Sequence, residues 1–291
     1  MARQIQETEF AGKENALQPA NRIKKNEKAN AIEKSLRILM SFAPQNKELR
    51  TTDLSQRLGY NLATVSRTLQ ILKRFGFLQQ NSRTKLFRLG PTISQLAVAI
   101  SRSMRTDFVH IVKPHADLLC EDVGSSINSA SVSIEVLSSE TTILVYNIRG
   151  SGPLQTIHTI GEPMPVHGSA GGKAILAFSS PEIVAGFLKA GLQRLTEKTI
   201  TTPKALLKEL DVIRKRGYAV DLEEVHAGIV AVAAPIFNLE GEPVAAITLA
   251  GAKFQLENLL DSTLPDQVKK TAQDISSELY HNNGDHLSRA E

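Results

Sequence analysis

Four ionisable side chains crowd into six consecutive positions in the second half of the chain: Asp221, Glu223, Glu224 and His226. A density of this kind is compatible with paired-carboxylate catalysis or with a metal site. Asp221 lies between two strand-like stretches, so we expect it to point into a cavity between a sheet and its helices. Glu223 and Glu224 are more consistent with ordinary exposed charges of a loop than with a catalytic or metal-binding role.

A catalytic interpretation of this cluster lacks its other parts. Two further histidines, His158 and His167, lie far away in sequence, and no second cluster of metal ligands accompanies them. Because the sequence also has no convincing nucleophile or cofactor motif, we expect neither a metal nor a cofactor. An enzyme that acts on a small acid through Asp221, Glu224 and His226 stays open as an alternative.

The glycine-rich segment of residues 163–177, PMPVHGSAGGKAILA, leads into a helix pattern. Free backbone amides at such a helix start could hold a carboxylate or a phosphate. A nucleotide-binding P-loop would require glycine at position 167 and a hydroxyl residue after Lys173, but the chain has His167 and Ala174. We therefore expect no nucleotide hydrolysis. An equally weighted alternative is that the small residues only let the helix pack closely on a sheet.

Basic residues are concentrated in the first third of the chain. Residues 1–90 contain 17 Lys and Arg against 7 Asp and Glu, a balance of +10, whereas residues 91–291 contain 17 against 23, a balance of −6. A basic segment on an acidic remainder indicates contact with a polyanion such as DNA. Charge alone is equally compatible with a basic tail, so the interpretation depends on the elements that carry it.

The apolar pattern of this basic third predicts three short helices after a flexible arm over residues 1–28. The second helix is expected to begin with Thr51 or Thr52 as its cap and to end at Gly59. Asn61 then caps a third helix. Three short helices, with a glycine in the turn before the third helix, predict a helix-turn-helix. The apolar stripe expected on the third helix is Leu62, Val65, Leu69 and Leu72.

Residues 77–89 read as two strands around a polar turn, which would form a wing beside the three helices. Arg67 and Gln70 could make bidentate base contacts, and Arg74 could reach a phosphate. A protein-binding module with the same elements remains an alternative. The candidate DNA contacts are Asn61, Ala63, Thr64, Ser66, Arg67, Gln70 and Arg74 on the third helix and Arg83, Lys85 and Arg88 on the wing.

The rest of the chain mixes helix and strand patterns, which predicts an α+β domain with helices on a mainly antiparallel sheet. Residues 91–123 have a helical pattern, and the first part of it, residues 91–105, is expected to form a linker helix. The strand-like runs are Ser126–Val136, Thr142–Ile148, Ile229–Phe237 and Val244–Leu249, with a hairpin turn over residues 238–241 before the last strand. The other helical runs are Gly172–Phe178, Pro181–Ala190, Pro203–Arg216 and Leu264–Tyr280.

Composition adds two expectations about the environment of the protein. No stretch approaches the roughly 18 apolar residues that cross a bilayer, so we expect a cytoplasmic protein without a membrane partner. A single cysteine, Cys120, suits a reducing compartment and is expected to be a buried helix residue. The expected division is an arm (1–28), a winged helix-turn-helix (29–90), a linker helix (91–105), a second domain (106–282) and a tail (283–291).

These residues resemble the IclR-type bacterial transcriptional regulators. In the first domain the resemblance rests on residues 54–60 (LSQRLGY), 64–67 (TVSR), 76–78 (GFL) and 87–90 (FRLG). The second domain supplies the more specific stretches, residues 172–177 (GKAILA), 217–224 (GYAVDLEE) and 228–238 (GIVAVAAPIFN), so that the resemblance covers about residues 30–282. It implies a winged helix-turn-helix and a GAF-like effector domain that binds small organic or aromatic acids. It also implies homodimers or dimers of dimers on palindromic DNA operators.

The resemblance also implies a set of effector-binding residues. The sequence departs from the family where members often have a cysteine (Ala231), a serine on the last strand (Ala250) and a serine on the recognition helix (Ala63). We expect these changes to enlarge the pocket, and we expect a small carboxylate held by amides at the helix start and by Thr248. Carried over by position, the effector contacts are Ala170, Gly171, Asp221, Ile229, Ala231, Thr248 and Ala250.

The function expected from these observations is that of a ligand-responsive transcriptional regulator, either a repressor or an activator. A small metabolite in the second domain would favour one arrangement of paired DNA-binding heads and so change operator affinity. The coupling would pass through residues 91–105.

Overall fold

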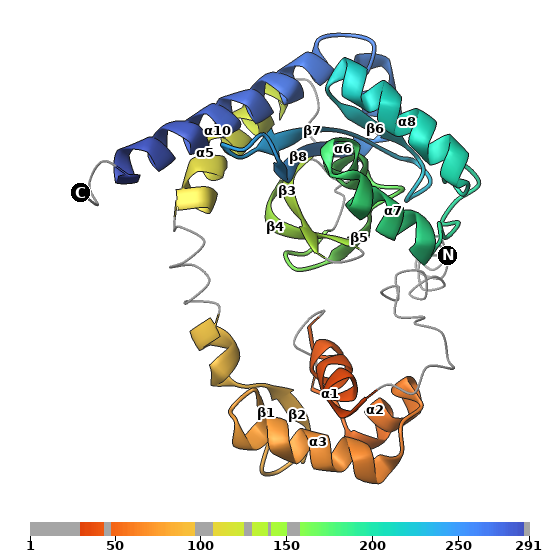
Figure 1. The fold of residues 1–291 in the computed structure, drawn as a ribbon, viewed down its shortest axis with the longest axis vertical. Helices are drawn as coiled ribbons and strands as arrows, with labels where there is room; N and C mark the ends of the chain where they lie inside the picture. Colours follow the sequence, from red (N-terminus) through yellow and green to blue (C-terminus); the bar gives the residue numbers. More distant parts are fainter. Residues whose placement is uncertain are drawn as a thin grey trace, which may run out of the picture.

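The computed structural model describes residues 30–43, 48–96, 107–124, 130–138, 141–149 and 158–287. The expected arm over residues 1–28 and most of the expected linker helix lie outside these residues, although residues 91–96 are helical. Among the helices that the structure describes, none is long and apolar enough to cross a membrane. The described elements form an N-terminal unit of helices with a hairpin and a C-terminal unit built on one sheet (Figure 1).

The N-terminal unit is a three-helix arrangement with a two-stranded hairpin, as the sequence predicts. Its elements are α1 (Ala31–Met40), α2 (Thr51–Leu58), α3 (Leu62–Arg74), β1 (Leu78–Gln80) and β2 (Phe87–Leu89). Burial of apolar side chains from all five elements holds the unit together, because no single short helix is stable alone. The buried core consists of Ile38, Phe42, Leu54, Val65, Leu69, Leu78 and Phe87.

The turn between α2 and α3 follows the predicted capping chemistry at one end. Gly59 ends α2 with a left-handed φ of 67°, and the side-chain oxygen of Asn61 caps α3 by accepting from the Ala63 amide at 2.8 Å. The prediction of a threonine cap for α2 is wrong. Arg50 is the N-cap residue, and its amide donates to the Asp53 carboxylate at 3.3 Å.

The apolar stripe of α3 is narrower than the sequence predicts. Val65 and Leu69 are buried, Leu72 is half-buried, and Leu62 is 50% exposed. Leu62 is the first residue of α3, where the helix begins beyond the edge of the core. The stripe still fixes the rotation of α3 about its axis, so the opposite face points to solvent.

The hairpin turn positions the basic residues that follow α3. Strands β1 and β2 pair antiparallel with Leu78 opposite Leu89 and Gln80 opposite Phe87. The side-chain oxygen of Asn81 accepts from the Arg83 and Thr84 amides at 2.9 and 3.1 Å, which closes the turn. The sequence thus forms the wing through a short local hydrogen-bond network.

The C-terminal unit contains a six-stranded sheet in which every neighbouring pair is antiparallel. The strand order is β5-β4-β3-β8-β7-β6, so two hairpins meet at the central β3·β8 pair. The α+β fold class is therefore confirmed, while β5 is a strand that the sequence does not predict. The strands are β3 (Ser131–Ser138), β4 (Thr141–Arg149), β5 (Pro163–Pro165), β6 (Ala219–Leu222), β7 (Ile229–Phe237) and β8 (Pro243–Ala252).

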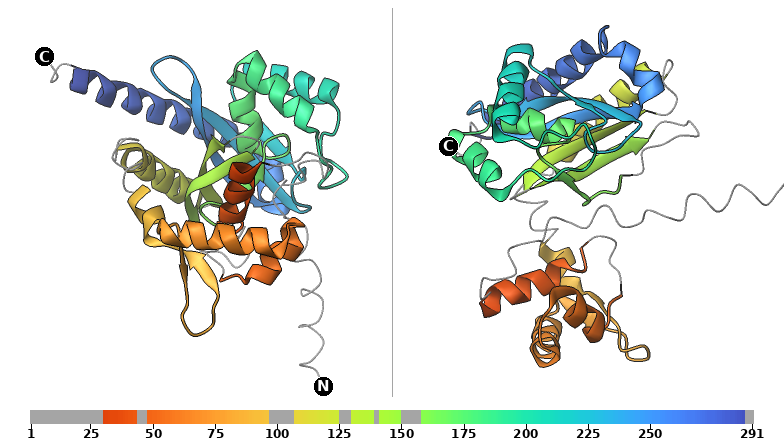
Figure 2. Two further views of the ribbon diagram at one scale, coloured as in Figure 1. Left: turned by 60° about the horizontal axis from the view of Figure 1, so that its bottom comes forward. Right: turned by 90° about the vertical axis from the view of Figure 1, so that its right-hand side faces the viewer.

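Helices cover both faces of this sheet (Figures 1 and 2). Helices α5 (Asp107–Gly124) and α10 (Leu264–Leu287) pack on one face, where Val132, Ile134 and Ile247 belong to the core. The other face meets α6 (Ala170–Phe178), which packs against β7 and β8 and in turn contacts α8 (Pro203–Arg216). The remaining described helices are α7 (Pro181–Ala190), α9 (Lys253–Leu256) and the short 3₁₀ helix η1 (Glu257–Leu259), and α10 continues to Leu287 rather than ending at Tyr280.

The start of α6 lies so close to the preceding turn that a side chain would not fit. A Cβ atom placed on Gly172 would lie 2.5 Å from both Cα and O of Val166, whereas one placed on Gly186 in α7 would meet nothing within 4 Å. Comparing the same substitution at the two glycines therefore distinguishes the effect of close packing on stability from the effect of helix propensity. This close approach brings α6 onto the sheet, as the packing alternative proposes.

We predict that Gly172→Ala lowers the free energy of unfolding by about 1–3 kcal/mol, because the new methyl group overlaps backbone atoms that cannot move aside. The matched variant Gly186→Ala should raise it by about 0.4–1 kcal/mol through reduced freedom of the unfolded chain. Urea unfolding of both variants measures these changes. Equal effects at the two positions would contradict the close approach of α6.

Candidate functional site

The first candidate site is the solvent-facing side of α3 and the hairpin. All ten residues that the sequence selects as DNA contacts are exposed there, and none takes part in the core. Residues 61–90 contain six basic and no acidic side chains: Arg67, Lys73, Arg74, Arg83, Lys85 and Arg88. A surface of this composition attracts a polyanion, and an exposed helix of this kind fits the major groove.

One basic residue of this surface was not among the sequence candidates. The ammonium group of Lys73 donates to the side-chain oxygen of Gln80 at 3.1 Å and so connects α3 to β1. The Gln80 side-chain amide donates to the Lys85 carbonyl at 3.0 Å, which extends the connection to the far side of the turn. Lys73 therefore links the two parts of the surface; its position next to Arg74 was the sequence signal that could have identified it.

The second candidate site lies on the face of the sheet that α6 covers. Cross-strand pairing aligns Ser131 with Ala250, Ala250 with Ala231, and Ala231 with Asp221. Because alternate residues of a strand share a face, Ser133 and Glu135 extend this surface along β3. These residues form one side of a cavity that α6 and the turn after β6 close from the other side.

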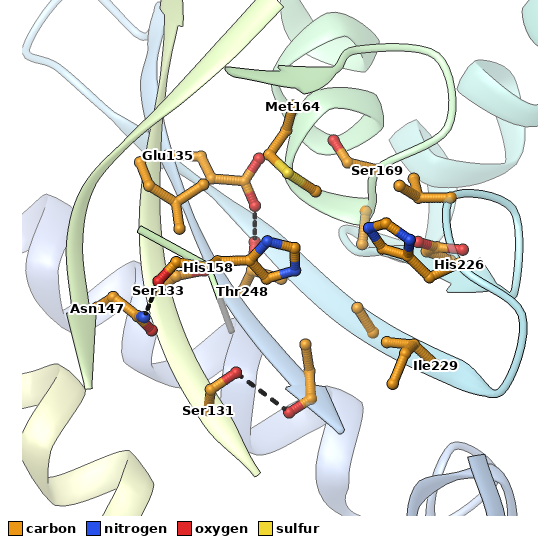
Figure 3. A pocket seen from close by; sticks show the side chains of 16 residues that line it. Ser131, Ser133, Glu135, Asn147, His158, Met164, Ser169, His226, Ile229 and Thr248 are labelled. Atoms are coloured by element: carbon orange, nitrogen blue, oxygen red, sulfur yellow. Dashed lines mark hydrogen bonds between the residues drawn. The ribbon is translucent and has the colours of Figure 1, made fainter. Parts of the chain in front are cut away.

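The structure places six of the seven predicted effector contacts on the wall of this cavity (Figure 3). They are Ala170, Asp221, Ile229, Ala231, Thr248 and Ala250. Gly171 is not a lining residue. The wall also includes polar side chains that the sequence did not select as effector contacts, namely Ser131, Ser133, Glu135, Asn147, His158, Ser169 and His226.

One of the amides that the sequence predicts to be open at the start of α6 is already hydrogen-bonded. The Ser169 hydroxyl caps the helix by accepting from the Gly172 amide at 3.0 Å. A Cβ atom placed on Gly171 would lie 2.4 Å from Oε1 of Glu135 and 2.6 Å from its Oε2. The first turn of α6 therefore already has a carboxylate against it, supplied by the chain itself.

Glu135 is held in this place from both sides. The Thr248 hydroxyl donates to its Oε1 at 2.8 Å, and the Thr142 hydroxyl donates to its Oε2 at 2.7 Å. The side chain of Thr248 is thus engaged by Glu135, where the sequence predicts a hydrogen bond to a ligand. Burial raises the pKa of the Glu135 carboxyl, while the two threonine hydroxyls and the nearby His158 act in the opposite direction.

A buried ion pair connects α6 to the turn after β6. The Lys173 ammonium is fully buried and forms an ion pair with Glu224. Glu224 is only 7% exposed, so its assignment as an exposed loop charge is wrong. The Glu224 amide donates to Oδ1 of Asp221 at 2.6 Å, and burial raises the pKa of Asp221 to about 7 although Lys173 opposes the shift.

The neighbouring Glu223 has a separate structural role. It adopts a left-handed φ of 64°, and its carboxylate forms ion pairs with Lys198 and, at 2.9 Å, with Lys253. The Glu223 carboxylate also accepts from the Gly228 amide at 2.9 Å. The hydrogen bond from Lys198, followed by those from Gly228 and Lys253, lowers the pKa of Glu223 to about 2. These contacts hold the ends of the turn over residues 223–228 together.

Two histidines meet at the cavity wall although 68 positions separate them in sequence. The ring centroids of His158 and His226 lie 5.8 Å apart, and Figure 3 shows both rings beside the same space. Burial, and then the charge of His158, lowers the pKa of His226. His167 is elsewhere and interacts with the Gln193 carbonyl. Within the described ranges, no three His, Cys, Asp or Glu residues form a group that could hold a metal.

Asp221 provides a pH test of the cavity wall. Its folded-state pKa of about 7 exceeds the ordinary value of 3.8, so the folded protein binds this proton more tightly than the unfolded chain. The stabilising contribution is complete below the ordinary value and is lost as pH rises toward 7. Relative to Asp221→Asn, the wild-type free energy of unfolding should therefore fall by up to about 1.4 kcal/mol per pH unit in this range. Urea unfolding of both proteins across it measures the difference, and parallel curves would refute the buried position of the carboxyl.

The chain is similar to known regulators over most of its length. The family model for the IclR helix-turn-helix domain matches residues 31–82, and that for the bacterial transcriptional regulator IclR C-terminal domain matches residues 101–277. The transcriptional regulator BhcR of Paracoccus denitrificans is 31% identical over 247 residues, which are 84% of this chain and 86% of BhcR. The transcriptional repressor YiaJ of Escherichia coli is 32% identical over 230 residues, 78% of this chain and 79% of YiaJ.

Solved structures show the same fold. A crystal structure of an IclR regulator from Silicibacter sp. TM1040 superposes with a TM-score of 0.75 at 25% identity, covering 86% of this chain and 96% of the other. An IclR homologue from Microbacterium hydrocarbonoxydans, solved in complex with 4-hydroxybenzoate, gives a TM-score of 0.69 at 21% identity and covers 86% and 99%. The chain belongs to the IclR family of bacterial transcriptional regulators and is a DNA-binding regulator, not an enzyme.

Proposed function

We propose that this regulator reads its operator with the exposed face of α3 and the hairpin, and that a small metabolite bound in the sheet cavity controls the affinity. The observation that carries the first part is the surface of residues 61–90, which has six basic side chains and no acidic one. Arg67 and Gln70 in the middle of α3 are proposed to contact bases. Arg74 and the hairpin residues Arg83, Lys85 and Arg88 are proposed to contact phosphates.

The cavity supports control by a small organic molecule. Its wall combines small apolar residues such as Ala231 and Ala250 with hydroxyl, amide and imidazole groups, the mixture that small-molecule sites use. The complex of the Microbacterium hydrocarbonoxydans homologue with 4-hydroxybenzoate supports an organic or aromatic acid as one candidate. Since Glu135 already lies at the start of α6, the carboxylate of such an acid would lie on the side of His158 and His226.

Binding at the cavity would act on DNA by favouring one arrangement of the heads over another. The helical residues 91–96 lead directly from the hairpin toward the second unit and are proposed as the first part of the coupling segment. Differential affinity of the metabolite for the two arrangements is the only energy source that this mechanism requires. The sign of regulation depends on which arrangement matches the operator.

We also propose that the protein acts as a dimer or dimer of dimers on a palindromic operator. Ile32, Leu36 and Met40 recur every four residues along α1 and are 73%, 57% and 59% exposed. Residues at this spacing share one face of a helix, so α1 presents an apolar stripe that no described element covers. A second copy of α1 would bury it and would pair two DNA-binding heads.

For DNA reading, we expect Arg67→Ala to weaken operator binding by about 1–3 kcal/mol and to relax sequence preference at one position of each half-site. The matched control is Arg194→Ala, which removes an exposed arginine from the other unit. Fluorescence anisotropy with a duplex selected from random sequence by the wild-type protein measures both. Affinity should also fall with salt at a slope near −0.9 per phosphate contact. Indistinguishable losses in the two variants would remove Arg67 from the reading surface.

For self-association, Leu36→Glu should raise the monomer fraction and weaken binding to a two-half-site duplex, because it places a charge in the proposed α1 contact. Leu239→Glu, at an exposed residue in the β7–β8 turn, is the matched control. Light scattering at micromolar concentration gives the mass of each variant. Unchanged association in Leu36→Glu would argue that α1 is not the contact.

For effector binding, Ala250→Leu should fill the cavity and remove the thermal stabilisation by whichever compound stabilises the wild type most in a panel containing 4-hydroxybenzoate. A ligand at 100 times its dissociation constant adds about 2.7 kcal/mol to the wild type, visible as a raised melting temperature. The control Ala190→Leu lies at the exposed end of α7. Retained stabilisation in Ala250→Leu would place the effector elsewhere.

A further inference from the structure

Glu135 occupies an unusual place for an acidic residue. It lies on the central strand β3, its side chain is 3% exposed, and it forms part of the cavity wall next to the first turn of α6. Gly171 makes this placement possible, because a Cβ atom there would lie within 2.6 Å of all three carboxyl atoms of Glu135. The alternation of β3 directs Ser131, Ser133 and Glu135 to the same face, so the position is part of the cavity and not of the opposite core.

The start of a helix favours a negative charge, since its amide groups and its dipole point toward that end. In this chain the Glu135 carboxylate lies against Gly171 in the first turn of α6, and the hydroxyls of Thr142 and Thr248 donate to its two oxygens. A second carboxylate beside the buried Glu135 carboxylate would meet a like charge at short range, where repulsion is strong. A hydroxyl or amino group could instead donate to the remaining lone pairs of Glu135.

We propose that Glu135 is a specificity-determining residue: it fills the anion position at the start of α6, excludes ligand carboxylates from it, and selects effectors that present a hydroxyl or amino hydrogen there. The proposal rests on the proposed function of the cavity as the effector site. Burial raises the pKa of this carboxyl, while the hydroxyls of Thr142 and Thr248 and the charge of His158 act in the opposite direction.

The first test uses acetate, because Glu135→Ala removes a CH₂–COO⁻ group of the same size and charge. Acetate, compared with chloride at equal ionic strength, should raise the melting temperature of Glu135→Ala by several degrees, and neutral acetamide should raise it less. The wild type, Glu135→Gln and the exposed control Glu240→Ala should not respond to acetate. Equal effects of acetate and acetamide, no effect of acetate on Glu135→Ala, or an equal effect of acetate on the wild type would each overturn the proposal.

A second variant keeps the proposal testable if Glu135→Ala does not fold. Glu135→Gln keeps the shape but removes the charge; its amide oxygen can accept from one threonine hydroxyl, and its NH₂ group can donate to the other. The affinity ratio of benzoate to benzyl alcohol should therefore rise at least fivefold over that of the wild type. The control Glu240→Gln should leave the ratio unchanged, and isothermal titration measures it. An unchanged ratio in Glu135→Gln, or no binding of benzoate to it, would overturn the proposal. The Ala250→Leu test asks whether the cavity binds the effector at all, whereas these two tests ask which ligand groups are admitted next to Glu135, so the two failures are distinguishable.

Discussion

Burying the ammonium group of Lys173 without a partner would cost several kcal/mol, because a charge loses its hydration in a low-dielectric interior. Glu224 prevents this loss by forming an ion pair with Lys173 from the turn after β6. The ion pair fixes α6 relative to that turn. Within the turn, the Asp221 carboxylate accepts a hydrogen bond from the Glu224 amide. The shape of the cavity depends on this arrangement, since α6 and the turn form the wall that faces the sheet.

The small residues of α6 act together with this ion pair. Gly172 lets the helix approach Val166, and Gly171 leaves room for the carboxyl of Glu135. A bulkier first turn would force α6 away from β3 and would separate Lys173 from Glu224. Close packing, the buried ion pair and the internal carboxylate are therefore parts of one structural solution, and the cavity is what remains between them.

The N-terminal unit is determined by fewer kinds of interaction: an apolar core and local hydrogen bonds in one turn. A small apolar core fixes the rotation of α3, and a hairpin closed by Asn81 places the second group of basic residues beside it. Because the polar face of α3 takes no part in the core, its residues can vary with the operator without loss of the fold. The expected linker and the described residues 91–96 connect this unit to the other, where a different set of forces shapes the binding cavity.

The sequence by itself determined the α+β class, the order of the elements apart from β5, the caps at Gly59 and Asn61 and the solvent-facing side of α3, because these depend on local periodicity and capping chemistry. Packing between distant segments brought His158 to His226 and Lys173 to Glu224 across large sequence separations. Tertiary contacts also decided that Glu224 is buried and that the Glu135 carboxyl lies against the first turn of α6. Burial, and with it the pKa and the partner of a charged group, follows from packing between segments, and no local pattern of residues encodes that packing.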